Sequence, residues 1–417
     1  MITRTLLLGL WLVAAIAAGV HVSKRPAPTS FAPQRALPVG FANEAQFSER
    51  FVTAADATAH VHAASLIELT DGRLQAVWFA GSREGGPDVT IQSAVFVPAT
   101  GQWRDERSIA TRAGTEKAAL RGTRKLGNPI IGRHSDGRLW VFYVSVAIGG
   151  WAGSSINAMY SADEGATWSR PERLITSPFF NLSTLVRTSP VLGADGTMLV
   201  PVYHQFIGKF GEVLRIDRHG TLLDKQRLSW GRDMLQPVLL PYSASDALVL
   251  LRTGGSDLPD RVSATRTVDA GRHWSPPTTI DLPNPDSALA GVVLRDGRML
   301  VALNDSESDR DVLSIALSTD TGRTWRIIKR LEDERAAIAL TADPAKYAAR
   351  AGDNARRQMC VGRTRCGFEF SYPNLIETRS GDIHIVYTWN RAAIKHVAMN
   401  RAALEQAIKS AGDASRP

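Results

Sequence analysis

The chain has 417 residues, of which 44% are hydrophobic and 22% are charged, and no long low-complexity block interrupts it. This composition supports a large buried core in one domain of the size that repeat folds reach. The formal net charge is +8, but no basic run with interleaved aromatic residues appears. Nucleic acid is therefore excluded as the expected partner, and acidic polysaccharide or anionic cell-surface material is favoured.

The N-terminus has the features of an export signal. Arg4 precedes an apolar run from Leu6 to Val20, whose small residues offer a cleavage site. Residues 1–23 are expected to be a signal peptide or, without cleavage, a short anchor that tethers the protein to the inner membrane through residues 6–20. Either outcome predicts an exported protein, periplasmic or extracellular. The proline-containing residues 24–44 predict a spacer.

One short motif, [ST]-x-D-x-G-x-x-W, occurs three times along the chain. The Ser or Thr ends a strand, the Asp caps a tight turn, the Gly takes a positive φ, and the Trp packs under the next strand. A degenerate copy at Asp217–Thr221 fills the longest gap, so the copies recur with a period of roughly 50 residues, as in propeller repeats. The three full copies are Ser161–Trp168, Thr267–Trp274 and Ser318–Trp325.

A second turn recurs independently between apolar, strand-like runs. A D-G pair between such runs is a strong short-range signal for a β-hairpin. Six hairpins with tryptophan-closed outer turns predict an all-β fold, a six-bladed β-propeller over residues 45–400; a seventh repeat is not found. The turns begin at Asp71, Asp136, Asp195, Ser245, Asp296 and Ser380.

One segment before the last hairpin breaks the β rhythm. Leu331 to Met359 is rich in Ala, Arg and Glu and predicts a helical insertion, with residues 331–370 forming either a lid or an outer decoration. Cys360 and Cys366 bracket five residues and favour a local disulfide in an oxidising compartment, with two free thiols as the alternative. Residues 401–417 predict a C-terminal helix and tail.

Polar residues stand at matching places in the repeats, where inner strands should be apolar. In a propeller such side chains converge on the axis at one face, so they are candidates for a site. They include Arg83, Glu84, Asp88, Arg187, His204, Arg252, Asn304, Asp305, Arg310, Tyr372, Trp389, Asn390, Arg391 and His396. No cluster of metal-ligating residues stands out, and neither a metal nor another cofactor is expected.

The repeated motif and the hairpin pattern resemble the sialidase (neuraminidase) superfamily, in its divergent bacterial branch. Members are six-bladed propellers that hold a sugar carboxylate with three arginines and use a tyrosine nucleophile with an aspartate as acid/base. The resemblance implies Arg252 and Arg310 as carboxylate-binding residues. It also implies Tyr372, in Phe370-Ser-Tyr-Pro373, as nucleophile and Asp88 as acid/base, with Glu84 as the alternative.

The chain departs from that family at two places. The motif that carries the first arginine is absent, because the chain has Val61-His-Ala-Ala-Ser-Leu66 there, and Arg83 or Arg187 is a candidate replacement. The glutamate before the fourth hairpin is replaced in Asp233-Met-Leu-Gln-Pro237, so Gln236 or Asp233 takes its place, and a glutamine cannot serve as a base. Each candidate also has a structural interpretation, such as an ion pair for the arginines or a core position for Tyr372.

These features predict an exo-acting glycoside hydrolase of sialidase-like type for terminal acidic sugars, working as a monomer. Its further substrate-binding candidates are Arg391, His204, Gln236 and Asn304. Two rivals remain: another chemistry on the same propeller and a non-catalytic carbohydrate-binding propeller. The first rival covers a neutral-sugar glycosidase and a polysaccharide lyase, in which Tyr203 and His204 would move the proton.

Overall fold

The computed structural model describes residues 9, 11–13, 30–33, 44–53, 60–177, 181–206, 208–228, 233–255, 260–333 and 368–414. Both cysteines, the greater part of the expected export signal and nearly all of the expected helical insertion lie outside the described residues. The first three residues assigned to that insertion belong instead to a strand, β22 (Arg326–Asp333).

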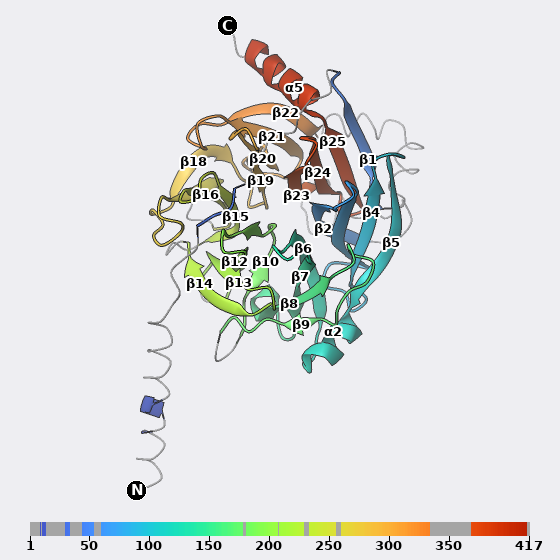
Figure 1. The fold of residues 1–417 in the computed structure, drawn as a ribbon, viewed down its shortest axis with the longest axis vertical. Coiled ribbons are helices and arrows are strands. Elements are labelled where there is room, and N and C mark those ends of the chain that lie inside the picture. Colours follow the sequence, from blue (N-terminus) through green and yellow to red (C-terminus); the bar gives the residue numbers. More distant parts are fainter. Residues whose placement is uncertain are drawn as a thin grey trace.

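Six antiparallel sheets are arranged as blades around a central axis, which confirms the six-bladed propeller (Figure 1). The first blade contains β2 (His60–Glu68), β3 (Leu74–Gly81), β4 (Thr90–Val97) and β5 (Gln102–Thr111). The second contains β6 (Lys125–Arg133), β7 (Leu139–Val146), β8 (Ser154–Ser161) and β9 (Glu172–Arg173). The third contains β10 (Leu185–Val186), β11 (Val191–Leu192), β12 (Met198–His204), β13 (Phe210–Ile216) and β14 (Leu222–Arg227).

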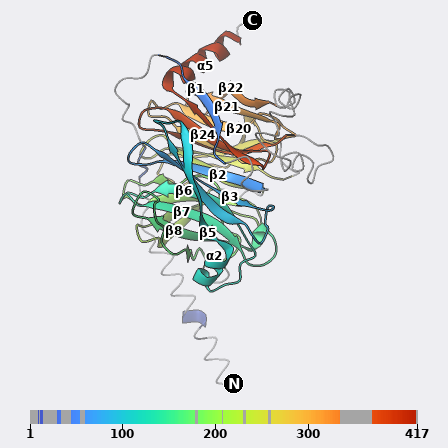
Figure 2. The same ribbon diagram turned by 90° about the vertical axis from the view of Figure 1, so that its right-hand side faces the viewer.

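The other three sheets complete the ring of Figure 1, and Figure 2 shows the molecule from the side. The fourth blade contains β15 (Met234–Pro241), β16 (Ala247–Thr253), β17 (Arg261–Thr267) and β18 (Thr278–Pro283). The fifth contains β19 (Ala290–Val293), β20 (Met299–Asn304), β21 (Val312–Ser318) and β22. The sixth contains β23 (Phe370–Glu377), β24 (Ile383–Trp389), β25 (Ala393–Met399) and β1 (Phe47–Phe51).

The second strand of each blade is the most apolar element of the repeat. All eight residues of β7, with the sequence LWVFYVSV, are buried, as are all seven of β16 and of β24. A strand covered on both faces needs such a continuous apolar run rather than an alternation. These strands therefore form the core between neighbouring blades and fix the register of the inner strands that carry the site.

The six predicted hairpin turns join the first and second strands of the six blades. The D-x-G-x-x-W motif closes the outer turns as expected. In the last copy Asp320 Oδ1 accepts from Thr324 N at 2.9 Å and Ser318 Oγ accepts from Gly322 N at 2.8 Å. Gly165 takes φ +83°, and a Cβ there would lie 2.2 Å from the Gln75 side chain, so glycine is required. Both kinds of turn lie at one end of the blades, opposite the end where the inner strands begin.

The ring is closed by strands from the two ends of the chain. β1 pairs with β25 in the last blade, with Phe47 opposite Met399 and Phe51 opposite Lys395. In this arrangement the outermost strand of the last blade comes from the N-terminal part of the chain, while its three inner strands come from the C-terminal part. The blade that carries Tyr372 therefore depends on residues near the N-terminus.

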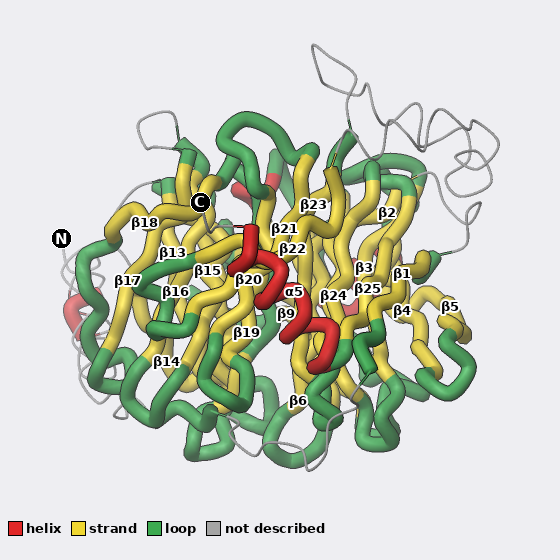
Figure 3. The backbone as a smooth tube through the Cα atoms, turned by 90° about the horizontal axis from the view of Figure 1, so that it is seen from above, coloured by secondary structure: helices red, strands yellow, loops and turns green. Residues whose placement is uncertain are grey.

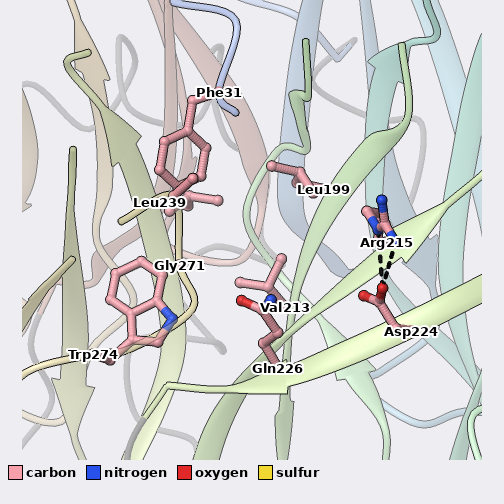
Figure 4. A pocket seen from close by; sticks show the side chains of 10 residues that line it. Phe31, Leu199, Val213, Arg215, Asp224, Gln226, Leu239, Gly271 and Trp274 are labelled. Atoms are coloured by element: carbon pink, nitrogen blue, oxygen red, sulfur yellow. Dashed lines mark hydrogen bonds and ion pairs between the residues drawn. The ribbon is translucent and has the colours of Figure 1, made fainter. Parts of the chain in front are cut away.

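The expected spacer includes a docked segment, which corrects the prediction for residues 24–44. Phe31 is 4% exposed and forms a bridge with Gly193, and its N–H donates to Ala244 O at 2.9 Å. Its ring enters an apolar pocket between the third and fourth blades, beside Leu239 and Trp274 (Figure 4). An aromatic side chain that finds such a pocket overrides the composition of the surrounding segment.

Helices are few in the described part of the chain, as Figure 3 shows. The predicted C-terminal helix is confirmed as α5 (Arg401–Ala414), which packs on β22 through the buried Leu404. The sequence did not predict α2 (Arg112–Ala119), whose N-cap is Thr111, or the short helix η1 (Trp151–Gly153). No helix among the described residues is both long enough and apolar enough to cross a membrane.

A buried histidine pair lies at the closure between the last and first blades. Trp103 Nε1 donates to His396 Nδ1 at 3.2 Å, so His396 Nε2 carries the proton in its hydrogen bond with His384 Nδ1, at 2.9 Å. Both imidazoles are therefore neutral. Burial and the nearby Arg50 lower the pKa of His384 to about 4 and that of His396 well below its usual value. His396 lies on β25, the third strand of its blade counted from the axis, so its candidacy for the axial site is wrong.

This pair predicts that acid weakens the fold. The folded-state pKa of His384 is below the unfolded value of 6.5, so the contribution is complete above pH 6.5 and is lost as the pH falls towards about 4. Unfolding by urea should show that His384→Gln removes about 3 kcal/mol of the decrease in stability between pH 7 and pH 4. Equal pH dependence in the wild type and the variant would contradict this role.

Candidate functional site

The site is built on a bulge that recurs in the inner strands. In β2, β6, β15 and β23 the register shifts at the same place, and a residue other than glycine takes a left-handed conformation. In three of the four blades a proline follows that residue, and proline cannot donate a ladder hydrogen bond. The bulged residues are Ala63 (φ 58°), Asn128 (φ 45°), Gln236 (φ 50°) and Tyr372 (φ 55°).

Tyr372 stands at the centre of the cluster. Arg252 Nη1 lies 3.1 Å from Tyr372 Oη and 3.0 Å from Gln236 Oε1, while Arg252 Nε donates to Asp286 Oδ1 at 2.7 Å. Gln236 Nε2 lies 3.3 Å from the hydroxyl of Tyr203. The guanidinium is thus fixed on three sides, and its orientation places a donor on the tyrosine oxygen.

Two more arginines belong to the cluster, and each is paired with a carboxylate. Glu369 Oε1 accepts from Arg310 Nη1 at 3.3 Å, and Glu369 Oε2 accepts from Arg391 Nε at 3.0 Å. Arg391 also pairs with Glu84, from the loop after β3. The side chains of Arg310 and Arg391 remain 20% and 25% exposed, so both can be reached by a ligand.

The charges shift the pKa values of the central groups. Burial opposes ionisation of Tyr372, but Arg252 and Arg310 outweigh it and lower the pKa of the phenol. Burial also opposes ionisation of Glu369, yet Arg391 and Arg310 hold the pKa of this carboxyl far below its usual range. Burial raises the pKa of Tyr203, which therefore stays protonated. The pKa values of the two axial tyrosines shift in opposite directions, and only Tyr372 accepts directly from an arginine.

Arg187 lies beneath Tyr372 and is only 1% exposed. It donates to the carbonyl oxygens of Tyr372, of Pro373 at 2.9 Å and of Ala64 at 3.4 Å, and its guanidinium lies 5.0 Å from the Tyr372 ring centre. Burial lowers the pKa of Arg187 to about 10. Its proposed contact with a substrate carboxylate is therefore wrong, because backbone carbonyls occupy the guanidinium; Arg187 supports the bulge instead.

Two histidines occupy the first-blade segment that lacks the family's arginine. The ring of His62 lies 4.2 Å from that of Tyr372, and His62 Nδ1 is 2.9 Å from Thr388 Oγ1. Burial and Arg391 lower the pKa of His60 to about 4 and that of His62 well below its usual value. The segment thus contributes neutral imidazoles to the site at neutral pH, not a cation.

Some sequence candidates do not join the cluster. Arg83 and Asp88 are exposed on the loop after β3, where Asp88 accepts from Ser82 N and Ser82 Oγ at 2.7 and 2.8 Å. Asn304 is 1% exposed and donates to the carbonyl of Phe370 at 2.7 Å, so its assignment to substrate binding is corrected to a link between blades.

His204 is also corrected, because it does not act together with Tyr203. His204 Nε2 lies 2.7 Å from Glu212 Oε2, and its ring stacks on Phe210 at 4.5 Å. Successive residues of a strand face opposite sides, which separates the histidine from the axial hydroxyl of Tyr203. The arrangement expected for a lyase is therefore absent from this part of the described chain.

Sequence reasoning missed Glu369 and Asp286, the two carboxylates that orient the arginines. Glu369 lies two residues before Ser371, in a run of aromatic residues, where a charged side chain needs a buried partner. A second signal was the residue–proline pair before three hairpins, which marks the bulges. It is found at Asn128-Pro129, Gln236-Pro237 and Tyr372-Pro373. Asp233 pairs with Lys209 at 3.1 Å, so Gln236 alone takes the place of the family's glutamate.

Among the described residues, no group of three or more His, Cys, Asp or Glu side chains is arranged to hold a metal ion. The arrangement can instead bind an anion between Arg252, Arg310 and Arg391 and present a tyrosine oxygen beside it.

The buried position of Arg187 predicts a large effect on stability. Arg187→Met leaves three buried carbonyls without their donor, which should lower the free energy of unfolding by about 3 kcal/mol. The matched change Arg83→Met, on an exposed loop, should alter it by less than about 0.5 kcal/mol. Urea unfolding compares the two, and equal stabilities would contradict the supporting role of Arg187.

Comparisons with known proteins agree with this fold. The model of the BNR repeat-like domain family matches residues 72–385, and no curated protein matches. Among solved structures, the Hadza microbial sialidase Hz136 is 15% identical with a TM-score of 0.65, over 85% of this chain and 69% of that chain.

Two further structures are similar over nearly their whole length. The intramolecular trans-sialidase from Ruminococcus gnavus is 12% identical, with a TM-score of 0.61 over 88% of this chain and 98% of that chain. A protein of unknown function from Dyadobacter fermentans is 13% identical, with a TM-score of 0.63 over 84% and 97%. At these identities the structures show the fold alone. Since the family model covers well over half of the chain, the protein belongs to the BNR repeat-like family and has a sialidase-like propeller.

Proposed function

We propose that this protein is an exo-acting glycoside hydrolase of sialidase type that cleaves terminal acidic sugars. One observation carries the proposal: Tyr372 Oη lies 3.1 Å from Arg252, at the axial end of the inner strands, beside two further arginines that a ligand can reach. A half-buried tyrosine with a lowered pKa beside anion-binding groups is suited to nucleophilic attack. The sialidase titles of similar structures support the same reaction class.

In the proposed complex, Arg252, Arg310 and Arg391 bind the carboxylate of the sugar. Guanidinium groups suit this task because their planar forks match a planar carboxylate. The substrate's negative charge would repel a carboxylate nucleophile, and a tyrosine avoids that repulsion. Arg391, from the loop after β24, would supply the third contact that the first blade lacks.

The loop after β3 would supply the acid. Asp88 is exposed on this loop and forms no ion pair with the three arginines among the described residues, whereas Glu84 is paired with Arg391. We assign the proton transfer to Asp88 and the positioning of Arg391 to Glu84. The Tyr372 oxygen, whose proton has left to solvent, forms a bond to the anomeric carbon while the glycosidic C–O bond breaks and Asp88 protonates the leaving oxygen. Water then displaces the tyrosine, with Asp88 accepting the proton.

A non-catalytic carbohydrate-binding propeller is the second candidate. The observation that favours it is Gln236, an amide at the position where the family has a glutamate, because an amide cannot accept the proton of the nucleophile. Binding of an acidic glycan by the same arginines would then be the whole function. The apolar N-terminal run supports placing either activity outside the cytoplasm.

Replacement of the nucleophile should abolish turnover. Fluorescence release from a fluorogenic sialoside should fall by about 10³-fold or more in Tyr372→Phe, since the oxygen that attacks is removed. Tyr160→Phe, which removes the hydroxyl of an exposed tyrosine, should keep the wild-type rate. Undiminished release by Tyr372→Phe would contradict the mechanism. No release by the wild type, together with saturable binding of acidic glycans, would support the second candidate.

The assignment of the acid predicts a dependence on the leaving group. Asp88→Asn should reduce kcat/KM by about 10²-fold for a sialoside of an ordinary sugar alcohol, whose oxygen must be protonated. The same variant should lose far less activity on a nitrophenyl sialoside, whose leaving group departs without a proton. Equal losses on the two substrates would contradict the role of Asp88.

A further inference from the structure

The hydroxyl of Tyr372 faces a hydrogen-bond donor. Arg252 Nη1, 3.1 Å away, can only donate, and the same guanidinium nitrogen also donates to Gln236 Oε1 at 3.0 Å. Among the described residues, no acceptor for the phenol proton lies within hydrogen-bond distance. An oxygen that accepts from a guanidinium, while its own proton has no acceptor among the described residues, is stabilised as an anion, because the hydrogen bond and the positive charge both favour the ionised form.

Unless the Tyr372 oxygen carries a negative charge, the positive charges around it outnumber the negative ones. In the described part of the chain, the groups that act on Tyr372 or are linked to it through ion pairs comprise four arginines and three carboxylates. The side chains of His60 and His62 add no charge at neutral pH because burial lowers their pKa values. The charged groups are Arg187, Arg252, Arg310 and Arg391 against Asp286, Glu369 and Glu84.

The excess positive charge can be assigned to Arg187, which lies close to Tyr372. Its described partners are three backbone carbonyls and not a carboxylate, although the side chain is almost completely buried. A buried guanidinium without a counter-ion is costly. The nearest group that can become an anion is Tyr372, whose ring centre lies 5.0 Å from the guanidinium carbon.

We propose that Tyr372 rests as a phenolate whose counter-ions are the surrounding arginines, and that Gln236 is the positioning residue that leaves this negative charge on the tyrosine. Gln236 Oε1 accepts from Arg252 and Gln236 Nε2 donates to the hydroxyl of Tyr203, so Gln236 orients the guanidinium without adding a charge. A glutamate at this position would be the fourth carboxylate and would satisfy the arginines by itself. On ionisation the phenol proton leaves to solvent, and no internal base is needed.

This state concerns the same tyrosine as the proposed function but exists without a substrate. It explains how the site can work although Gln236 replaces the family's base: the nucleophile is already deprotonated. The two ideas are separable, since a phenolate can be present in a protein that only binds glycans. A tyrosinate signal without turnover would contradict the hydrolase and leave the inference intact.

Ultraviolet difference spectroscopy of the whole protein tests the inference, because tyrosinate absorbs at longer wavelength than tyrosine. The wild type minus Tyr372→Phe, at neutral pH, should show the absorbance of one tyrosinate, and the wild type minus Tyr160→Phe should show none. Burial raises the pKa values of Tyr143, Tyr203 and Tyr387, so these residues contribute no tyrosinate absorbance at neutral pH. A Tyr372 signal that appears only when the pH passes the ordinary value near 10 would overturn the proposal.

Gln236→Glu tests the positioning role with almost no change in shape. The variant should lose the tyrosinate signal at neutral pH while its circular dichroism spectrum and unfolding midpoint stay close to those of the wild type. This loss identifies the amide as the cause and does not depend on whether Tyr372→Phe folds. A full tyrosinate signal in Gln236→Glu would overturn the role of Gln236.

Discussion

A guanidinium group can be buried at the centre of a propeller only where acceptors surround it, and this requirement organises the site. Arg187 meets it with backbone carbonyls of the first and last blades, and so it holds the bulge that turns Tyr372 towards the axis. Arg252, Arg310 and Arg391 meet it with carboxylates from other blades. The tyrosine is placed by these cations as much as by its own strand.

The closure of the ring supports this placement. β1 completes the blade that begins with Tyr372, and the pair formed by His384 and His396 fills the seam towards Trp103. These groups lie away from the axis and touch no part of the arginine cluster that the structure describes. They act on the site only through the stability of the blade, which separates their effect in experiments from that of Arg252 or Gln236.

The fold could be predicted from the sequence because its signals are local. A D-G turn and a D-x-G-x-x-W motif each specify their backbone within eight residues, and repetition made them unambiguous. The site was only partly predictable, since its contacts join residues far apart in the chain. Tyr372, Arg252, Arg310, Arg391, Glu84 and Gln236 were all candidates that the structure brings together. Glu369 and Asp286 escaped notice because nothing in the sequence near them shows which arginines they face.

Other misses have the same origin. Arg187 and Asn304 looked like ligand-binding residues because a polar side chain in an inner strand suggests a site, but both donate to backbone carbonyls between blades. Phe31 lay in a proline-containing segment that predicted a spacer, and the pocket that holds it is formed by two distant blades. In each case the sequence showed an unusual residue type but did not show which residues it contacts.

The proposed role of Tyr372 is tested most directly by trapping the covalent intermediate. A fluorinated sialoside with a good leaving group slows the second step, so that intact-protein mass followed by peptide mapping locates the sugar. We expect one glycosyl group on Tyr372, and none in Tyr372→Phe. A wild-type protein that releases the leaving group while the label is absent, or is attached to another residue, would contradict the mechanism.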